Sequence, residues 1–472
     1  MLNVISFFGI FGLCFIAWLG SEDRRKIPWK VIFWGIGLQL LVGALVFQVP
    51  VTRDSMMVLN DLLNVVIDAS ESGARFLFGP IIVPHPGTVG PGEAGRWIAR
   101  ALGGAYVPIL GDRLGGDFLD LGYIFAFRAL PQVIFFSALI SLLYRLGVIQ
   151  PVVQVFAKIF QKTMGLSGAE SLSGAANIFV GIESALAVKP FLADMTRSEL
   201  CAILTSCFGS IASTVLGLYA GFLRPVFPTI TGHLMSASII AIPACFVISK
   251  ILVPETNSPK TMGGIPADPE ADPDVKQPSL MDSLILGALD GVNMAVGIAS
   301  ALIAIIGLVA LINSFFGGLA GLANSNIVPL QYLGRLFSVV TLDNIFGVLF
   351  LPLTCLTGVS LEWRELWQAS VTIGQRVLLT EIPSYLRLAT LSKQGMISDR
   401  ALLVVSYVLC GFTHIASYGI FVGGLAAIVP SRRGEISSIG WKSLWAATLA
   451  TMMTGCIAGL FYFGNSVSVL GR

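Results

Sequence analysis

Two acidic residues in strongly apolar surroundings are the clearest candidates for chemistry. Glu183 and Glu381 each lie in a hydrophobic segment that is interrupted by polar residues. An ionised carboxylate at the centre of a bilayer costs about 2.5–3.5 kcal/mol even on permissive insertion scales. We therefore expect both carboxylates to face a shared wet cavity and to accept hydrogen bonds from a polyhydroxylated solute. The alternative is that each pairs with a cation, for which Lys189 and Arg376 are the obvious partners.

Oxygen-bearing side chains accompany the first carboxylate. Asn177 supplies an amide, and Ser210 lies where residues 209–214 interrupt another apolar stretch. Hard oxygen ligands from a hairpin and a neighbouring broken helix suit a small alkali cation. The alternative for Ser210 is a hydrogen bond to a carbonyl of the preceding turn, which is common in membrane helices. Composition alone favours that alternative.

A histidine lies in the apolar stretch 399–428 of the second half. His414 is accompanied by Gly411, Thr413 and Ser417, so it is either a hydrogen-bonded packing residue or part of a site. Histidine is the side chain that changes charge near neutral pH, which makes His414 a candidate carrier of a coupling proton. Phe412 is either a packing residue or a surface on which a flat ring stacks.

The composition excludes a soluble protein. Of the 472 residues, 55% are hydrophobic and only 12% are charged, whereas a soluble domain is about 25% charged. Because a membrane span needs only about 20 apolar residues, the chain is interpreted as one polytopic membrane unit. The net charge of +2 is too small for a nucleic-acid-binding surface. The sequence has no His-Glu-x-x-His motif and no Gly-x-x-x-x-Gly-Lys loop, which argues against a zinc hydrolase and an ATP-driven pump.

Hydropathy and charge predict the layout. Apolar helices at about 4–20 and 31–49 flank a basic loop that should face the cytoplasm, which places the N-terminus outside. Residues 55–78 are amphipathic and are expected to lie along an interface. The boundaries of the predicted regions are N-terminal helices at 1–80, an external loop at 81–117, a first repeat at 118–252, a flexible cytoplasmic linker at 253–280 and a second repeat at 281–472.

The two repeats follow the same order of segments. Each has a span, an amphipathic helix, a hydrophobic segment interrupted by polar residues, and two more spans. The interrupted segments at about 167–192 and 361–392 are too polar to face lipid. Re-entrant hairpins are tolerated at membrane depth where they are buried in protein or line water. With the linker inside, the first hairpin enters from the cytoplasm and the second from outside, which predicts an inverted repeat with a binding site near the midplane.

From residue 1 to about 465, apart from the 80–117 loop and the linker, the sequence resembles the concentrative nucleoside transporter family. The resemblance implies an all-α polytopic membrane protein with eight transmembrane helices and two oppositely oriented re-entrant hairpins. It also implies a homotrimer that takes up nucleosides on a sodium or proton gradient across the inner membrane, without a cofactor or enzymatic activity. The motifs that carry it include Met164–Ser171, Asn177–Gly181, Lys189-Pro190, Met195–Leu200, Ser210–Ala212, Tyr219-Ala220, Leu252–Thr256, Gly347–Pro352, Gly358-Val359, Glu381 with Tyr385, and Leu409–Phe412.

The site motifs are only partly kept. The family's Gly-Gln-Thr-Glu is one residue shorter here, so that Ile182 alone replaces the two residues that contact the nucleobase, and we expect a shifted base preference. Asn-Glu-Phe becomes Thr380-Glu381-Ile382 and retains the ribose-binding glutamate, while Gly-Phe-Ala-Asn becomes Gly411–His414. The implied substrate-binding residues are Ile182, Glu183, Val215, Glu381, Phe412, His414 and Ser417, and the implied sodium-binding residues are Asn177, Val180, Ser210 and Ile211.

Two other classes of function remain open at this point. One is a relative of the same fold that acts as a sensor or a gate and does not transport the solute. Such a protein would also lack the residues that contact the nucleobase. Gly165-Leu166-Ser167-Gly168 fits the motif of rhomboid intramembrane proteases, with His414 as the partner of Ser167. Accumulation of a labelled solute that depends on an ion gradient would distinguish a transporter from both.

Overall fold

The computed structural model describes residues 1–79, 82–83, 124–179, 181, 184–185, 188–264, 279–464 and 469–471. Within these residues all regular secondary structure is helical, so the predicted all-α class is confirmed. Most of the predicted external loop and residues 265–278 of the linker lie outside the described residues. The predicted site residues Val180, Ile182 and Glu183 also lie outside them.

Eight spans can be traced in the described part of the chain. Six are single helices that are long and apolar enough to cross a membrane, and two are interrupted near the middle. The single helices are α1 (Leu2–Leu19), α2 (Trp29–Gln48), α5 (Phe125–Arg145), α11 (Ile230–Leu252), α12 (Leu280–Gly321) and α19 (Arg433–Phe461). The interrupted spans are α9 (Arg197–Gly209) with α10 (Ser213–Leu223), and α17 (Asp399–Val408) with α18 (Ile415–Ile428).

The amphipathic helix α3 (Pro50–Phe78) turns its polar face toward protein. Asn60 Oδ1 accepts a hydrogen bond from the Gly232 N–H at 3.3 Å, and Glu71 pairs with Arg128 of α5 at 2.7 Å. Val58 and Leu62 on the opposite side are 70% and 60% exposed. Neighbouring helices therefore satisfy part of the polar face of α3, and its location along an interface stays a prediction.

Shorter helices lie between the spans and the hairpins. The amphipathic helix α6 (Ile149–Met164) buries Val153, Ala157 and Phe160, which recur at helical spacing. In the second half, α12 is followed by η3 (Leu322–Asn324), α13 (Val328–Val339) and α14 (Leu342–Leu356), and α13 and α14 are bent by 60° at their junction. In both repeats, shorter helices thus lie between a span and the hairpin that follows it: α6 in the first repeat, and α13 and α14 in the second.

The two hairpins enter from opposite sides. Hairpin 1 contains α7 (Gly168–Ala176) and α8 (Lys189–Leu192), and hairpin 2 contains α15 (Trp363–Leu379) and α16 (Glu381–Lys393). The entrance of hairpin 1 contacts the end of α11, where Leu252 O accepts a hydrogen bond from Glu22 N just after α1. The entrance of hairpin 2 follows Thr357, whose carbonyl accepts from Ser6 Oγ near the start of α1. The hairpin entrances thus lie at opposite ends of α1, as the inverted repeat requires.

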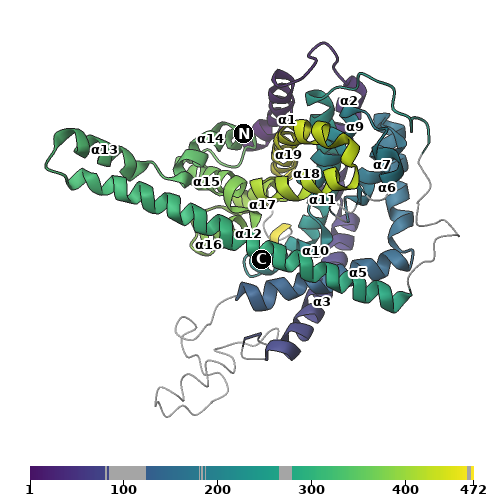
Figure 1. Ribbon diagram of the computed structural model, residues 1–472, viewed down its shortest axis with the longest axis horizontal. Coiled ribbons are helices and arrows are strands. Elements are labelled where there is room, and N and C mark those ends of the chain that lie inside the picture. The colour runs from purple at the N-terminus through teal and green to yellow at the C-terminus, as the bar shows by residue number, and fades with distance from the viewer. Residues whose placement is uncertain are drawn as a thin grey trace.

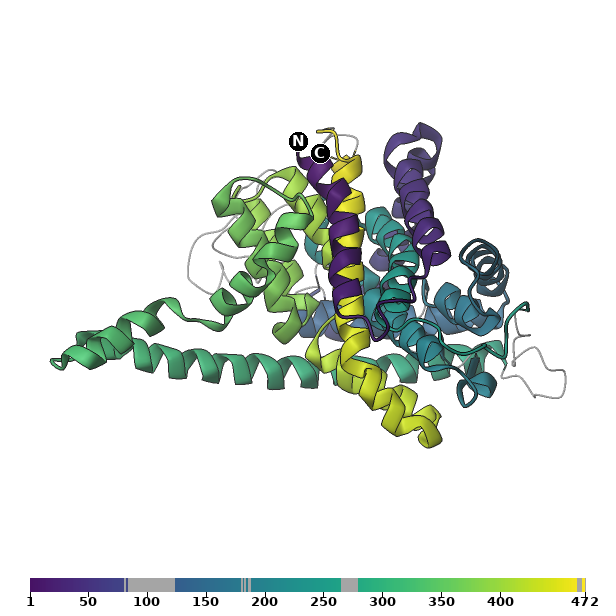
Figure 2. The same cartoon turned by 90° about the horizontal axis from the view of Figure 1, so that it is seen from above.

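Close helix packing holds this arrangement together. The long helix α12 extends across the molecule and carries α13 at its far end, while α5 packs along its first part (Figure 1). Gly287 permits that contact, because a Cβ there would lie 2.5 Å from Ser141 Cβ. Figure 2 shows α1 and α19 side by side, with both chain ends at the same end of the pair. After α18, η4 (Pro430–Arg432) leads into α19.

Candidate functional site

A cavity of about 120 Å³ lies where the tip of hairpin 2 meets the two interrupted spans and α12. Because its walls come from both repeats, the cavity is where the sequence predicts a binding site. The residues that line it include Gly181, Val215, Leu218, Tyr219, Gly297, Ile298, Leu302, Thr380, Glu381, Phe412, His414, Ser417 and Phe421.

The two helix interruptions contact each other through glycines. Gly209 ends α9 against α11, and a Cβ there would lie 2.2 Å from Cys245 Sγ. A Cβ at Gly411 would lie 3.1 Å from the carbonyl of Gly209. Glycine at 411 thus lets the two main chains approach closely, and the following helices α10 and α18 both line the cavity.

Glu381 is the first residue of α16 and is 4% exposed. Its Oε1 accepts a hydrogen bond from the Tyr219 hydroxyl at 2.5 Å. Its Oε2 lies 2.8 Å from His414 Nε2, but no donor among the described residues, this imidazole included, is aligned to form a hydrogen bond with Oε2. One carboxylate oxygen is therefore held in place, and the other is an acceptor without an aligned donor.

His414 has two roles in the structure. It is the N-cap of α18, because its Nδ1 accepts a hydrogen bond from the Ser417 N–H at 3.2 Å. An accepting Nδ1 carries no proton, so this bond requires the tautomer with the proton on Nε2. Nε2 lies 2.7 Å from Ser417 Oγ and 2.8 Å from Glu381 Oε2. The side chain is thus both a helix cap and part of the cavity wall.

The structure brings five of the predicted substrate-binding residues to this cavity. Val215, Glu381, Phe412, His414 and Ser417 all line it. Among them, the Phe412 ring meets the His414 ring edge-on with centroids 6.4 Å apart. Their shared location agrees with the prediction, while their roles in binding remain proposals.

Of the two predicted cation pairs only that of Glu381 with Arg376 can be followed, because Glu183 lies outside the described residues. Arg376 is fully buried, but it donates hydrogen bonds to Val408 O and to Thr451 Oγ1, the latter at 3.2 Å. Val408 is the last residue of α17, where helix carbonyls lose their usual partners and need other donors. Lys189 is exposed. The pairing of Glu381 with Arg376 is therefore wrong within the described structure, and His414 occupies that position.

The predicted ion ligands lie beside the first interruption. Asn177 is fully buried, and neither atom of its side-chain amide has a hydrogen-bond partner among the described residues. Ser210 Oγ lies within hydrogen-bonding distance of Asn177 O at 3.1 Å and of Ser206 O at 2.9 Å, so the predicted back-bonding also occurs. Ile211 is buried in the interruption. A buried amide oxygen without a donor, together with carbonyl and hydroxyl oxygens, suits a hard cation such as Na⁺.

The sequence interpretation missed Tyr219 as a site residue. Its hydroxyl contacts Glu381, which is 162 positions away in the chain, and its ring stacks on Tyr385 with centroids 4.7 Å apart. The available signals were its polar hydroxyl in an apolar helix and its place in the Tyr219-Ala220 motif. Thr380, at the tip of hairpin 2, was also missed, and its buried Oγ1 has no hydrogen-bond partner among the described residues.

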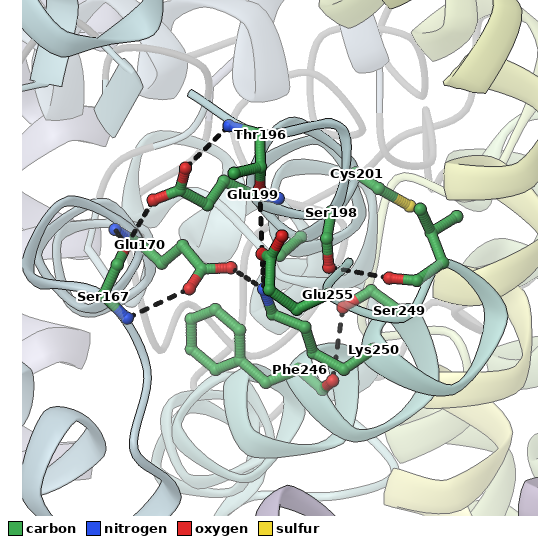
Figure 3. A network of polar contacts seen from close by, with 12 residues as sticks. Ser167, Glu170, Thr196, Ser198, Glu199, Cys201, Phe246, Ser249, Lys250 and Glu255 are labelled. Carbon is green, nitrogen blue, oxygen red and sulfur yellow. Dashed lines mark hydrogen bonds and ion pairs between the residues drawn. The ribbon is translucent and has the colours of Figure 1, made fainter. Parts of the chain in front are cut away.

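A polar network closes the entrance of hairpin 1 (Figure 3). Ser167 and Glu170 form a reciprocal capping box at the start of α7, and Thr196 and Glu199 form another at the start of α9. The two boxes are joined by a hydrogen bond of 2.6 Å from Ser167 Oγ to Glu199 Oε1. Ser167 is thus a helix cap bonded to a glutamate, and the protease dyad with His414 is not formed.

The end of α11 and the start of the linker complete this network. Lys250 Nζ pairs with Glu170 Oε1 and lies 3.3 Å from Glu255 Oε2, and Figure 3 shows its ammonium group pointing between these carboxylates. Thr261 accepts hydrogen bonds from two N–H groups at the start of α7, from Gly168 at 2.9 Å and from Ala169 at 3.1 Å. These contacts join Glu255 and Thr261, in the first part of the predicted linker, to the entrance of hairpin 1, while the flexibility of the linker stays a prediction.

Comparison with known proteins identifies the family. Residues 8–81 match the model of the Na⁺-dependent nucleoside transporter N-terminus, 126–226 that of nucleoside recognition, and 233–459 that of the Na⁺-dependent nucleoside transporter C-terminus. An uncharacterized transporter of Haemophilus influenzae is 32% identical over 460 residues, which cover 97% of each chain. The chain belongs to the concentrative nucleoside transporter family.

Relatives of known structure and name agree with this assignment. A structure of CNTnw in an inward-facing substrate-bound state is 32% identical, has a TM-score of 0.80 and covers 98% of each chain. Solute carrier family 28 member 3 of Mus musculus is 30% identical, and the match spans 97% of this chain but only 59% of the mouse protein. This concentrative nucleoside transporter is therefore a multi-pass membrane protein that carries out ion-coupled nucleoside transport and is not an enzyme.

Proposed function

We propose that this transporter uses a sodium gradient to take up nucleosides or related ribosyl solutes, with Glu381 accepting a hydrogen bond from a ribose hydroxyl. The observation that carries this proposal is the state of the Glu381 carboxylate. It is 4% exposed and lines the cavity, and its Oε2 has no aligned donor among the described residues. A buried carboxylate oxygen that lines a cavity gains from a ligand hydroxyl that donates to it, because hydrogen bonds to charged groups are stronger than those between neutral groups.

The apolar part of the cavity lining suits a flat ring. Val215, Leu218 and Ile298 contribute apolar side chains, and Phe412 adds an aromatic one. Such a wall binds a nucleobase by shape and stacking, which supports the expected shift in base preference. We assign Ile182 and Glu183 to the same site on the family motif.

Sodium is the proposed coupling ion. Asn177 and Ser210 supply the oxygen ligands described above, and the family motif adds the main-chain carbonyls of Val180 and Ile211. The description of the matching models as Na⁺-dependent supports this choice.

Proton coupling through His414 is a second candidate. The observation in its favour is the distance of 2.8 Å between His414 Nε2 and Glu381 Oε2, because protonation of the imidazole would change the charge beside the solute acceptor. Uptake measured with sodium replaced by choline at several pH values separates the two ions. Loss of uptake at every pH supports sodium, and uptake that persists and rises in acid supports the proton.

We further propose a homotrimer in the inner membrane with the N-terminus outside. The exposed apolar side chains of α12, such as Ile303 and Leu311 at 77% and 67%, suit a surface covered by lipid or by another subunit. Native mass spectrometry of the purified protein should give a mass of three chains, and accessibility labelling of an added N-terminal tag should place that tag outside.

Transport itself is tested in proteoliposomes. We expect labelled nucleosides to accumulate when sodium is imposed outside, and we expect Glu381→Gln to reduce that accumulation. A thermal-shift screen with nucleosides and Na⁺ reports binding independently of transport. Binding without accumulation would indicate the sensor alternative, and absence of both would contradict the proposed function.

A further inference from the structure

A short hydrogen bond joins the two repeats at the cavity. The Tyr219 hydroxyl of α10, in the first repeat, donates to Glu381 Oε1 of hairpin 2, in the second repeat, at 2.5 Å. Tyr219 is fully buried and Glu381 nearly so. Hydrogen bonds to an ionised carboxylate are shorter and stronger than those between neutral groups.

The ring of Tyr219 is fixed by a second tyrosine. Tyr385 lies one helical turn after Glu381 on α16, and the rings of Tyr219 and Tyr385 stack with centroids 4.7 Å apart and planes at 19°. The hydroxyl of Tyr385 donates to Ser406 O at 3.1 Å, so this ring is anchored to α17. Tyr219 therefore cannot turn away without breaking the stack.

This anchoring determines which oxygen of Glu381 is available. Tyr219 occupies Oε1 and opposes rotation of the carboxylate, so Oε2 stays on the side of His414 and the cavity. Without the hydroxyl, the carboxylate could turn and present either oxygen to His414, whose Nε2 lies 2.8 Å from Oε2. A solute hydroxyl would then compete with His414 for either oxygen.

We propose that Tyr219 is a positioning residue that holds Glu381 so that Oε2 accepts a sugar hydroxyl, and that it thereby sets the preference for ribosyl over hydroxyl-free solutes. This proposal rests on the proposed function of Glu381. The alternative is a purely structural role, in which the Tyr219 hydroxyl donates a hydrogen bond to the buried carboxylate and stabilises the fold.

The test compares two variants that each lose one hydroxyl from the stacked pair. Tyr219→Phe keeps the ring stack and removes the bond to Glu381, whereas Tyr385→Phe keeps the stack and removes the bond to Ser406. Initial uptake rates are measured in proteoliposomes for a ribonucleoside and for the 2′,3′-dideoxynucleoside with the same base. This pair of solutes differs only in the hydroxyls that Glu381 can bind.

In Tyr219→Phe we expect KM for the ribonucleoside to rise about 10-fold or more, as for loss of a hydrogen bond to a charged group, with KM for the dideoxynucleoside unchanged. Tyr385→Phe should change the two KM values by the same factor. Tyr219→Phe added to Glu381→Gln should cause no further loss, because both changes remove the same interaction.

Two results would overturn the positioning role while leaving the proposed function intact. One is wild-type discrimination between the two solutes in Tyr219→Phe, and the other is an equal loss for both solutes, which indicates a role in folding alone. If the wild-type protein accumulates no nucleoside, the proposed function itself fails, and the role of Tyr219 fails with it.

Discussion

The two re-entrant hairpins occupy equivalent places in the repeats, but the described charges that distinguish them lie at different ends. In hairpin 1 the described ionised groups gather at the entrance, where Lys250 meets Glu170 and Glu255. In hairpin 2 the buried carboxylate of Glu381 stands at the tip, beside the cavity. Among the described residues, charge therefore anchors the entrance of hairpin 1 and lines the cavity at the tip of hairpin 2.

Helix length explains why hairpin 1 needs an anchor. Its first helix, α7, has nine residues, most of them small, so it has little side-chain surface with which to pack. The helices α15 and α16 have 17 and 13 residues, and α15 packs closely on α14, where Ser370 Oγ donates to Gly347 O at 2.6 Å. Changes at the entrance of hairpin 1 should therefore affect stability, and changes at the tip of hairpin 2 should affect transport.

The largest effect is expected for Lys250→Met. This substitution leaves Glu170, which is 1% exposed, without its cation, and removing one partner of a buried ion pair costs about 3–5 kcal/mol. A thermal melt of the detergent-purified protein should show a large drop in Tm. Lys260→Met is the matched control, because Lys260 pairs with Asp194 at 2.9 Å on the exposed surface and should change stability by less than about 1 kcal/mol. Equal melts of the two variants would contradict an anchoring role.

Glu381→Gln should spare stability and impair transport. We expect kcat/KM for nucleoside uptake to fall about 10–100-fold, because the variant loses a charge-assisted acceptor worth about 1.5–3 kcal/mol. Glu362→Gln, at the exposed entrance of the same hairpin, is the control and should transport at the wild-type rate. If Glu381→Gln transported normally, the tip of hairpin 2 would lose its assigned role.

A smaller effect is expected for Ser167→Ala at the entrance of hairpin 1. It removes the N-cap of α7 and the hydrogen bond to Glu199, and loss of an N-cap costs about 1 kcal/mol. The melting temperature should fall while KM remains unchanged. A rise in KM without a loss of stability would show that this entrance also contributes to solute binding.

The smallest effect is a gain in stability at the tip of hairpin 2. Thr380 has φ of 74° and ψ of 172°, a conformation that is essentially restricted to glycine and that costs about 1–3 kcal/mol in other residues. In Thr380→Gly the strain is relieved, but glycine loses more backbone entropy on folding. The net result should be a stabilisation of about 1 kcal/mol. Thr380→Ala is the control that removes the hydroxyl but retains Cβ. Equal melts of the Gly and Ala variants would contradict backbone strain.

The sequence predicted the spans and the hairpins well because both depend on local composition. The helices α1 and α2 begin and end within two residues of the predicted limits, and α15 and α16 lie almost within the predicted 361–392. Polar residues in apolar segments also located Glu381 and His414.

The partners of these residues could not be predicted in the same way. Arg376 was assigned to Glu381 because the two are close in the chain, but its guanidinium contacts the end of α17 and α19 instead. Tyr219 reaches Glu381 across 162 positions, and that approach depends on how the two repeats pack. Local pattern locates a polar group in an apolar segment, whereas its partner is set by tertiary contacts.

One wall of the cavity has a mechanical consequence. The long helix α12 contributes Gly297, Ile298 and Leu302 to the cavity lining, and Glu381, His414 and Tyr219 line other parts of it. Hydrogen bonds between directional groups fix one register, but contacts between aliphatic groups are similar in many registers. Movement of the solute-binding elements past these three residues of α12 would therefore break no directional side-chain hydrogen bond with them, so this surface would resist sliding only weakly.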